Sequence, residues 1–172
     1  MKHAFHHKPS GDKSTSVVRE AAFEYPKKNP GPVRSAKMGQ IVEQIVAQQL
    51  PSSKIISAVQ LGLGIGEMEH LREILDLPIE GLAAKLGISK ATLHRRKVAG
   101  KLDSAESDRL VRFARLMGKA VEVMESEENA RKWLNSRQVG LGGAVPLDYA
   151  ETEVGAREVE DLLVRIEYGV YS

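Results

Sequence analysis

The chain has 172 residues, of which 42% are hydrophobic and 28% are charged, as in ordinary globular proteins. No stretch reaches the roughly 20 consecutive apolar residues of a membrane-spanning helix, which excludes a spanning protein. The absence of cysteine excludes disulfides, thiolate zinc sites and cysteine nucleophiles. It also fits a reducing compartment, and the N-terminus has no apolar signal run, so we expect a cytoplasmic protein.

The net charge of +2 is unevenly distributed along the chain. Residues 1–59 carry a net charge of +5, residues 60–119 carry +3, and residues 120–172 carry −6. A basic first part and an acidic last part indicate two surfaces with different partners.

Residues 1–36 are predicted to be a flexible basic arm. Four of the seven prolines fall here, and large apolar residues do not recur at a regular spacing. Such a segment cannot bury enough apolar surface to offset the entropy of ordering it. Its histidines, His3, His6 and His7, can hold a metal loosely, but a solvated tail is the expected state and no metal site is predicted.

From Lys37 onward, apolar residues recur at the spacing of amphipathic helices. The first predicted helix carries Met38, Ile41, Val42, Ile45 and Val46, and Pro51 ends it. Ser52 or Ser53 can cap a short second helix with Ile55, Ile56 and Val59. The run Gly62-Leu-Gly-Ile-Gly follows no strand and precedes no Lys-Ser/Thr pair, so it predicts an irregular turn rather than a phosphate loop. Residues 67–77 are predicted to be helical.

Residues 79–98 have the pattern of a helix-turn-helix. Leu82, Ala83 and Leu86 supply the packing face of the first helix, and Gly87 allows the positive φ of a tight turn. Ile88 is expected in the core, Ser89 is placed to cap the second helix, and Leu93 faces inward.

The second helix of this motif is a candidate DNA-binding element. In such motifs its N-terminal part enters the major groove, where basic side chains contact guanine edges or phosphates. The candidate contacts are Ser89, Lys90, Thr92, His94, Arg95 and Lys97. Arg96 departs from the pattern, because motifs of this kind place an apolar residue there. Helix-turn-helix geometry also occurs as plain helix packing with a solvated basic face, and both interpretations remain open.

The second half of the chain is also predicted to be helical. Asp103 and Glu106 have the spacing of a capping box at the start of a long helix, whose apolar stripe is Leu110, Ala114, Met117, Val121 and Met124. A helix through Ala130–Leu134, a glycine-rich loop over residues 139–146 and a last helix over residues 153–168 follow. Trp133 is expected to be largely buried against the last helix, beside Val159, Leu162, Leu163 and Ile166. Since no segment alternates as a strand does, the predicted fold class is all-α.

The C-terminal end carries two tyrosines in its last five residues, Tyr168 and Tyr171. Gly169 is a natural helix stop, which leaves a short tail with a tyrosine ring and a carboxylate. The tyrosines either fold back over Trp133 or fill the pocket of another protein, since tyrosine is enriched at such contacts. The sequence leaves these alternatives open.

The segment from Lys37 to Ser172 is similar to antitoxins of the MbcA/ParS/Xre group, the partners of RES-domain toxins. The similarity runs from Gly62-Leu-Gly-Ile through Ile88-Ser-Lys-Ala-Thr-Leu-His-Arg-Arg to Leu102-Asp-Ser-Ala-Glu. It is more specific in the second half, where Ala130-Arg-Lys-Trp-Leu, Leu141-Gly-Gly-Ala-Val-Pro-Leu and the helix after Thr152 follow in order with family-like spacing.

The resemblance implies an all-α antitoxin with two modules. Residues 37–125 would form an Xre-like helix-turn-helix and dimerisation module, and residues 126–172 a small helical toxin-binding module. The arm before Lys37 is not part of the family pattern. The implied partners are a cognate RES-domain toxin, operator DNA and a second copy of the chain in a homodimer within a larger complex, without a membrane or a cofactor.

The resemblance also implies a mechanism. Members of the group neutralise a toxin that consumes NAD or transfers ADP-ribose from it, by placing the antitoxin's C-terminal end at the toxin's active-site cleft, and they repress their own operon. In this chain that end consists of Glu167, Tyr168, Gly169, Val170, Tyr171 and Ser172.

Two other classes of function are weaker interpretations of the sequence. A free-standing helix-turn-helix transcription regulator shares the first module but gives no reason for the acidic second half and its aromatic tail. An enzyme is not expected, because neither His70 nor His94 has a motif partner of the kind that general acid–base chemistry requires.

Overall fold

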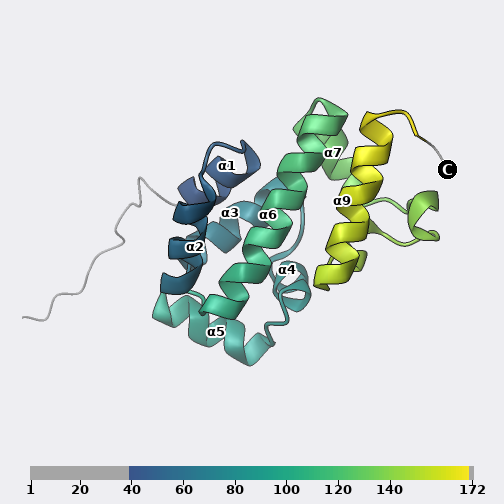
Figure 1. Ribbon diagram of the computed structural model, residues 1–172. Coiled ribbons are helices and arrows are strands. Elements are labelled where there is room, and N and C mark those ends of the chain that lie inside the picture. The colour runs from purple at the N-terminus through teal and green to yellow at the C-terminus, as the bar shows by residue number, and fades with distance from the viewer. Residues whose placement is uncertain (1–38, 171–172) are drawn as a thin grey trace, which may run out of the picture. The chain divides into compact units, whose positions relative to one another are not determined.

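A 21-residue helix, α6 (Ser104–Met124), is the element against which most others pack in the computed structural model, which describes residues 39–170. Figure 1 shows α1 (Gln40–Val46), α2 (Ser52–Leu61) and α3 (Ile65–Leu75) on one side of α6, and α7 (Glu127–Leu134) and α9 (Glu153–Glu167) on the other. The apolar stripe of α6 explains this central position, because Leu110, Phe113, Ala114 and Met117 are fully buried.

The start of α6 is fixed by the capping box that the sequence predicts. The Asp103 carboxylate accepts a hydrogen bond from the Glu106 backbone N–H at 2.8 Å, and the Glu106 carboxylate accepts one from the Asp103 N–H at 2.9 Å. These bonds pair two of the backbone donors that a helix start leaves free.

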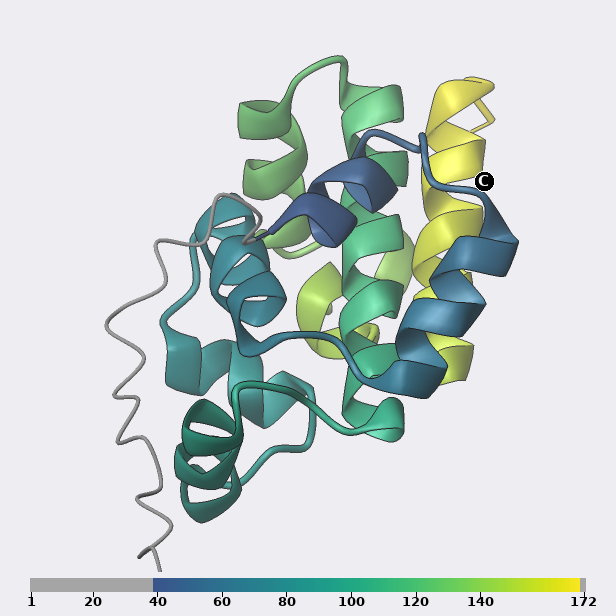
Figure 2. The same cartoon turned by 90° about the vertical axis from the view of Figure 1, so that its left-hand side faces the viewer.

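Helix α1 is held against both α3 and α6. The buried carboxylate of Glu67 on α3 accepts a 2.8 Å hydrogen bond from the Val42 backbone N–H and so caps the start of α1. At the other end, a Cβ on Gly118 of α6 would lie 2.6 Å from the Val46 carbonyl oxygen. Glycine at position 118 therefore allows α1 and α6 to cross with their backbones in contact (Figure 2).

The boundary between α1 and α2 differs from the prediction. Helix α1 ends at Val46, before Pro51, and the chain turns at Gln48, which has a φ of 56°. The expectation that Ser52 or Ser53 caps α2 is wrong, because both lie inside the helix and Pro51 holds the capping position. The Pro51 carbonyl accepts from the backbone N–H groups of Lys54 and Ile55, and over residues 51–61 no side chain caps the helix start.

The C-terminal part contains two short elements where the sequence predicted only a loop. These are the 3₁₀ turn η1 (Val139–Leu141) and the one-turn helix α8 (Pro146–Tyr149). Thr152 caps α9 by accepting from the Gly155 N–H at 3.0 Å. A Cβ on Gly155 would lie 1.8 Å from the Tyr149 carbonyl oxygen, so glycine there lets α9 start directly against the end of α8.

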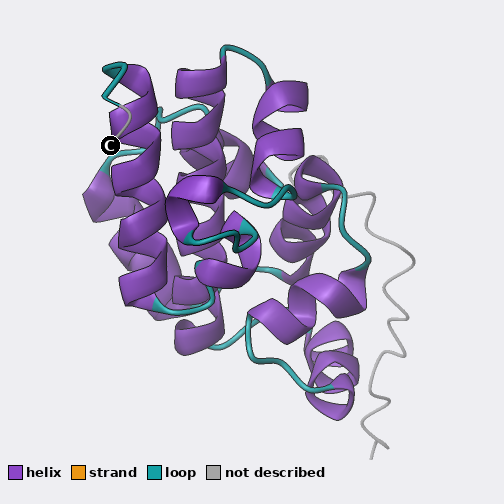
Figure 3. Ribbon diagram, turned by 90° about the vertical axis from the view of Figure 1, so that its right-hand side faces the viewer, coloured by secondary structure: helices purple, strands orange, loops and turns teal. Residues whose placement is uncertain are grey.

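The all-α fold class is confirmed for the residues that the structure describes. Residues 39–170 contain helices, turns and two isolated bridges but no strand (Figure 3), and all of them belong to one compact unit. Trp133 is partly buried and packs against the core, whereas its neighbour Leu134 is fully buried. None of the helices among residues 39–170 combines the length and apolar character that crossing a membrane requires. The predicted arm, with His3, His6 and His7, lies outside the described residues.

Candidate functional site

Helices α4 (Ile79–Lys85) and α5 (Lys90–Ala99) form the predicted helix-turn-helix. The inward-facing positions Leu82, Ala83, Leu86, Ile88 and Leu93 are all buried. The turn between the helices has a φ of 70° at Gly87, which favours glycine. The Leu86 carbonyl in that turn accepts a 2.8 Å hydrogen bond from Arg109 of α6. The motif is therefore fixed to the body of the protein at its turn.

Of the six predicted DNA-contacting residues, Ser89 caps the start of α5 and the other five lie within this helix. Ser89 caps α5 by accepting from the Thr92 N–H at 3.2 Å, and the Thr92 hydroxyl in turn accepts from Arg95 at 3.1 Å. Lys90, His94 and Lys97 are exposed on one flank, where they line a shallow cavity of about 400 Å³ with Leu93 and Glu80. The structure thus brings together an exposed row of basic side chains.

Arg96 points away from this row, toward the start of α6. Its Nε lies 2.7 Å from a carboxylate oxygen of Glu106, and its Nη2 lies 2.7 Å from one of Asp103. The hydrogen bond to Glu106 raises the pKa of the Arg96 guanidinium above its already high ordinary value. Where the usual motif has an apolar residue, this chain therefore has an arginine that forms ion pairs with the two residues of the capping box. Sequence reasoning missed this pair, although Asp103 and Glu106 were identified for their capping role.

The second candidate region is the C-terminal end of α9. Gly169 follows the helix with a φ of 66°, and the Val170 N–H donates back to the Arg165 carbonyl at 2.9 Å, which closes the helix end. Tyr168 is 73% exposed and Val170 is 52% exposed. Tyr168 therefore does not fold back into a core over Trp133. Tyr171 and Ser172 lie outside the described residues.

Glu167 ties this end to the body of the protein. Its carboxylate lies 2.9 Å from the Lys119 ammonium of α6. Hydrogen bonds to Glu167 and then to Glu122 raise the pKa of Lys119. Of the predicted C-terminal contact residues that are described, Glu167 is thus engaged within the chain, and Tyr168, Gly169 and Val170 are exposed beyond it.

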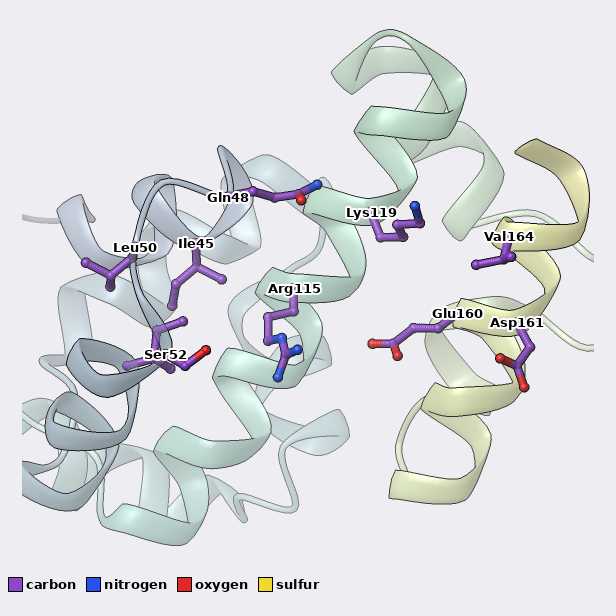
Figure 4. Close-up of a pocket in the computed structure, with 10 residues that line it drawn as sticks. Ile45, Gln48, Leu50, Ser52, Arg115, Lys119, Glu160, Asp161 and Val164 are labelled. Carbon is purple, nitrogen blue, oxygen red and sulfur yellow. The ribbon is translucent and has the colours of Figure 1, made fainter. Parts of the chain in front are cut away.

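A cavity of about 390 Å³ lies between α6, α9 and the segment that joins α1 to α2. Figure 4 shows Arg115 and Lys119 extending from α6 and Glu160 extending toward them from α9. Apolar side chains of Ile45 and Leu50 form the opposite wall. This lining contains charges of both signs, from Arg115 and Lys119 on α6 and from Glu160 and Asp161 on α9. Within residues 39–170 there is also no cluster of three acidic or histidine side chains that could hold a metal ion.

The two regions match two models of known protein families. Residues 54–115 match the antitoxin Xre-like helix-turn-helix domain, and residues 119–169 match the antitoxin Xre/MbcA/ParS C-terminal toxin-binding domain. A protein named Antitoxin Xre from Yersinia enterocolitica is 31% identical over 128 residues, which cover 72% of this chain and 86% of that protein. The chain belongs to the Xre family of antitoxins. The predicted resemblance is therefore confirmed.

Two further relatives named Antitoxin Xre match shorter parts of this Xre-family antitoxin. The protein from Photorhabdus laumondii is 38% identical over 42% of this chain and 50% of its own length. The protein from Pseudomonas putida is 33% identical over 37% of this chain and 40% of its own length. In the structure, the helix-turn-helix match spans α2 to the middle of α6, and the toxin-binding match runs from Lys119 of α6 to Gly169.

Proposed function

We propose that this antitoxin neutralises a RES-domain toxin that acts on NAD by placing its C-terminal end, Glu167–Ser172, in the active-site cleft of the toxin. The observation that carries the proposal is the end of α9, where Gly169 stops the helix and leaves Tyr168 and Val170 exposed. A short tail after a helix stop can enter a cleft that the blunt end of a helix cannot. A tyrosine ring resembles, in chemistry, the aromatic part of a dinucleotide.

We further propose that the antitoxin represses its own operon as a homodimer in the cytoplasm, with α5 in the major groove of the operator. The exposed side chains of Lys90, His94, Arg95 and Lys97 support this role, because such side chains bind phosphates and guanine edges. In this proposal residues 37–125 form the DNA-binding and dimerisation module, and residues 126–172 the toxin-binding module. A basic arm over residues 1–36 precedes both.

The test of neutralisation is co-expression with a candidate RES-domain toxin. We expect the full chain to restore growth and a chain ending at Gly169 to fail. Both should melt at nearly the same temperature, because the one described residue that is removed, Val170, is 52% exposed and contributes a single backbone hydrogen bond to the helix end. A matched control is Val139→Ser, which removes a 95% exposed valine elsewhere in the toxin-binding domain and should still protect.

The other outcomes of this experiment contradict the proposal in different ways. If the shortened chain still protects cells, the tail does not block the toxin and neutralisation must come from the acidic helical surface. If it fails but also melts early, the tail is structural. If the full chain does not protect, a free-standing transcription regulator becomes the better interpretation.

A further inference from the structure

Helix α5 is fastened to the rest of the protein at few points. Of its ten residues, Leu93 is the one that is buried. Arg96 follows three residues later, on the same side of the helix, and its side chain is 29% exposed. Lys90, His94, Arg95 and Lys97 are exposed. The carbonyl of Gly100, which caps the end of α5, accepts a 3.0 Å hydrogen bond from the Ile65 N–H. The orientation of α5 therefore depends on this backbone contact at its end, on Leu93 and on the contacts of Arg96.

The Arg96 contacts are directional. The guanidinium reaches two carboxylates with two different nitrogens, Nε to Glu106 and Nη2 to Asp103, each at 2.7 Å. A planar guanidinium bound at two points fixes both the position and the direction of its helix, which a single apolar contact does not. A lysine, with one ammonium group, would not reproduce this geometry.

The two carboxylates are themselves held in place. Each accepts a backbone hydrogen bond of the capping box, at 2.8 and 2.9 Å, and Glu106 is buried. They are therefore part of the rigid start of α6, the helix on which the fold is built. A guanidinium bound to them connects α5 to α6 without a flexible link.

In this arrangement the Arg96 guanidinium binds two carboxylates of the same chain. We propose that Arg96 is a positioning residue for DNA recognition, which sets the angle of α5 by clamping it to Asp103 and Glu106. The inference rests on the proposed binding of α5 to operator DNA. Hydrogen bonds to base edges require side chains placed to within a fraction of an ångström, whereas phosphate contacts tolerate a shift of the helix. The clamp therefore acts on sequence preference more than on general affinity for DNA.

Two variants break the clamp from opposite sides. Arg96→Leu removes the guanidinium. The double variant D103N/E106Q removes both carboxylate charges but keeps the capping box, because asparagine caps helices well and glutamine can replace glutamate in the box. The matched controls are Arg157→Leu, an exposed arginine that pairs with Glu153 within α9, and E127Q/E128Q, which makes the same charge change at the start of α7.

The measurement is the affinity of the full chain for two duplexes of equal length, one from the promoter of its own operon and one with a scrambled sequence. We expect Arg96→Leu and D103N/E106Q to lower the preference for the promoter duplex about tenfold or more, the effect of losing one good base contact. Arg157→Leu, which lies outside the helix-turn-helix, should keep the preference. The double variant D103N/E106Q separates the two effects most clearly. Removing two negative charges should by itself tighten binding to any DNA, whereas breaking the clamp should lower the preference for the promoter duplex.

Several results would overturn the proposal. If both clamp variants melt like the wild type and keep its preference within about twofold, the clamp does not position α5. If Arg96→Leu weakens binding and lowers the salt dependence equally on both duplexes and keeps the preference, Arg96 is itself a phosphate contact. If Arg96→Leu does not fold, the result with D103N/E106Q decides. A wild-type chain without any preference would contradict the proposed DNA binding itself, and the positioning role with it.

Discussion

Trp133 and Leu134 are neighbours in the sequence but take different places in the packing. Leu134 is fully buried at the end of α7, whereas Trp133 is partly buried at the edge of the core. A large residue that occurs once, such as Trp133, is the first candidate for the core in a sequence. In the structure the fully buried side chain is that of Leu134. The two side chains differ in burial because adjacent residues of a helix point about 100° apart around its axis.

We predict that Leu134→Ala destabilises the protein more than Trp133→Ala does. Truncation of a fully buried leucine costs about 2–5 kcal/mol, because it removes buried apolar surface and leaves a cavity. The loss at Trp133 should fall below the roughly 3–5 kcal/mol of a fully buried aromatic residue. Urea unfolding followed by circular dichroism measures both. A larger loss at Trp133 would show that its partial contacts hold α7 in place.

At the scale of elements, the salt dependence of DNA binding tests whether α5 is the DNA-contacting helix. The double variant Lys90→Ala/Arg95→Ala should weaken binding and reduce the slope of log affinity against log salt concentration by about two, since each lost phosphate contact releases roughly one counterion fewer. The control is Lys132→Ala, an exposed cation on α7 that pairs with Glu128. An unchanged slope in the double variant would mean that the helix-turn-helix is a scaffold.

Local signals in the sequence predicted most helices and several of their ends. Ser89, the capping box of Asp103 and Glu106, and the stop at Gly169 are each confirmed, because they depend on residues three or four positions apart. The start of α2 was predicted wrongly, because Pro51 takes the capping position in an extended conformation and both serines lie inside the helix. Helix α8 was missed because four residues are too short to show a period.

The candidate sites were predictable to different degrees. The row of cations on α5 follows from helical spacing alone. The link from Arg96 to Glu106 spans only ten residues, but it depends on how the chain turns at Gly100, which has a φ of 76°. The sequence could not predict that Tyr168 is exposed either. A tyrosine folded back over Trp133 and a tyrosine that faces another protein fit the same sequence pattern.

At the scale of the whole molecule, the two regions matched by family models share one helix and are joined by ion pairs. The helix-turn-helix match ends at residue 115 and the toxin-binding match begins at residue 119, both within α6. Lys85 of α4 pairs with Asp148 and Glu151 near α8, and Arg112 of α6 lies 3.1 Å from Glu153 of α9. A shared helix and these contacts favour a single folding unit.

We therefore predict that the two regions unfold in one cooperative transition. Far-ultraviolet circular dichroism reports all helices, whereas the fluorescence of the single tryptophan, Trp133, reports α7 in the toxin-binding region. The two thermal curves should coincide, because unfolding α7 and α9 alone would expose the apolar face of α6. The variant D148N/E151Q should lower stability by at most about 1 kcal/mol, since Asp148 and Glu151 are largely exposed, and should keep the curves coincident. A fluorescence transition that clearly precedes the loss of helix would instead identify residues 126–172 as a separately folding module.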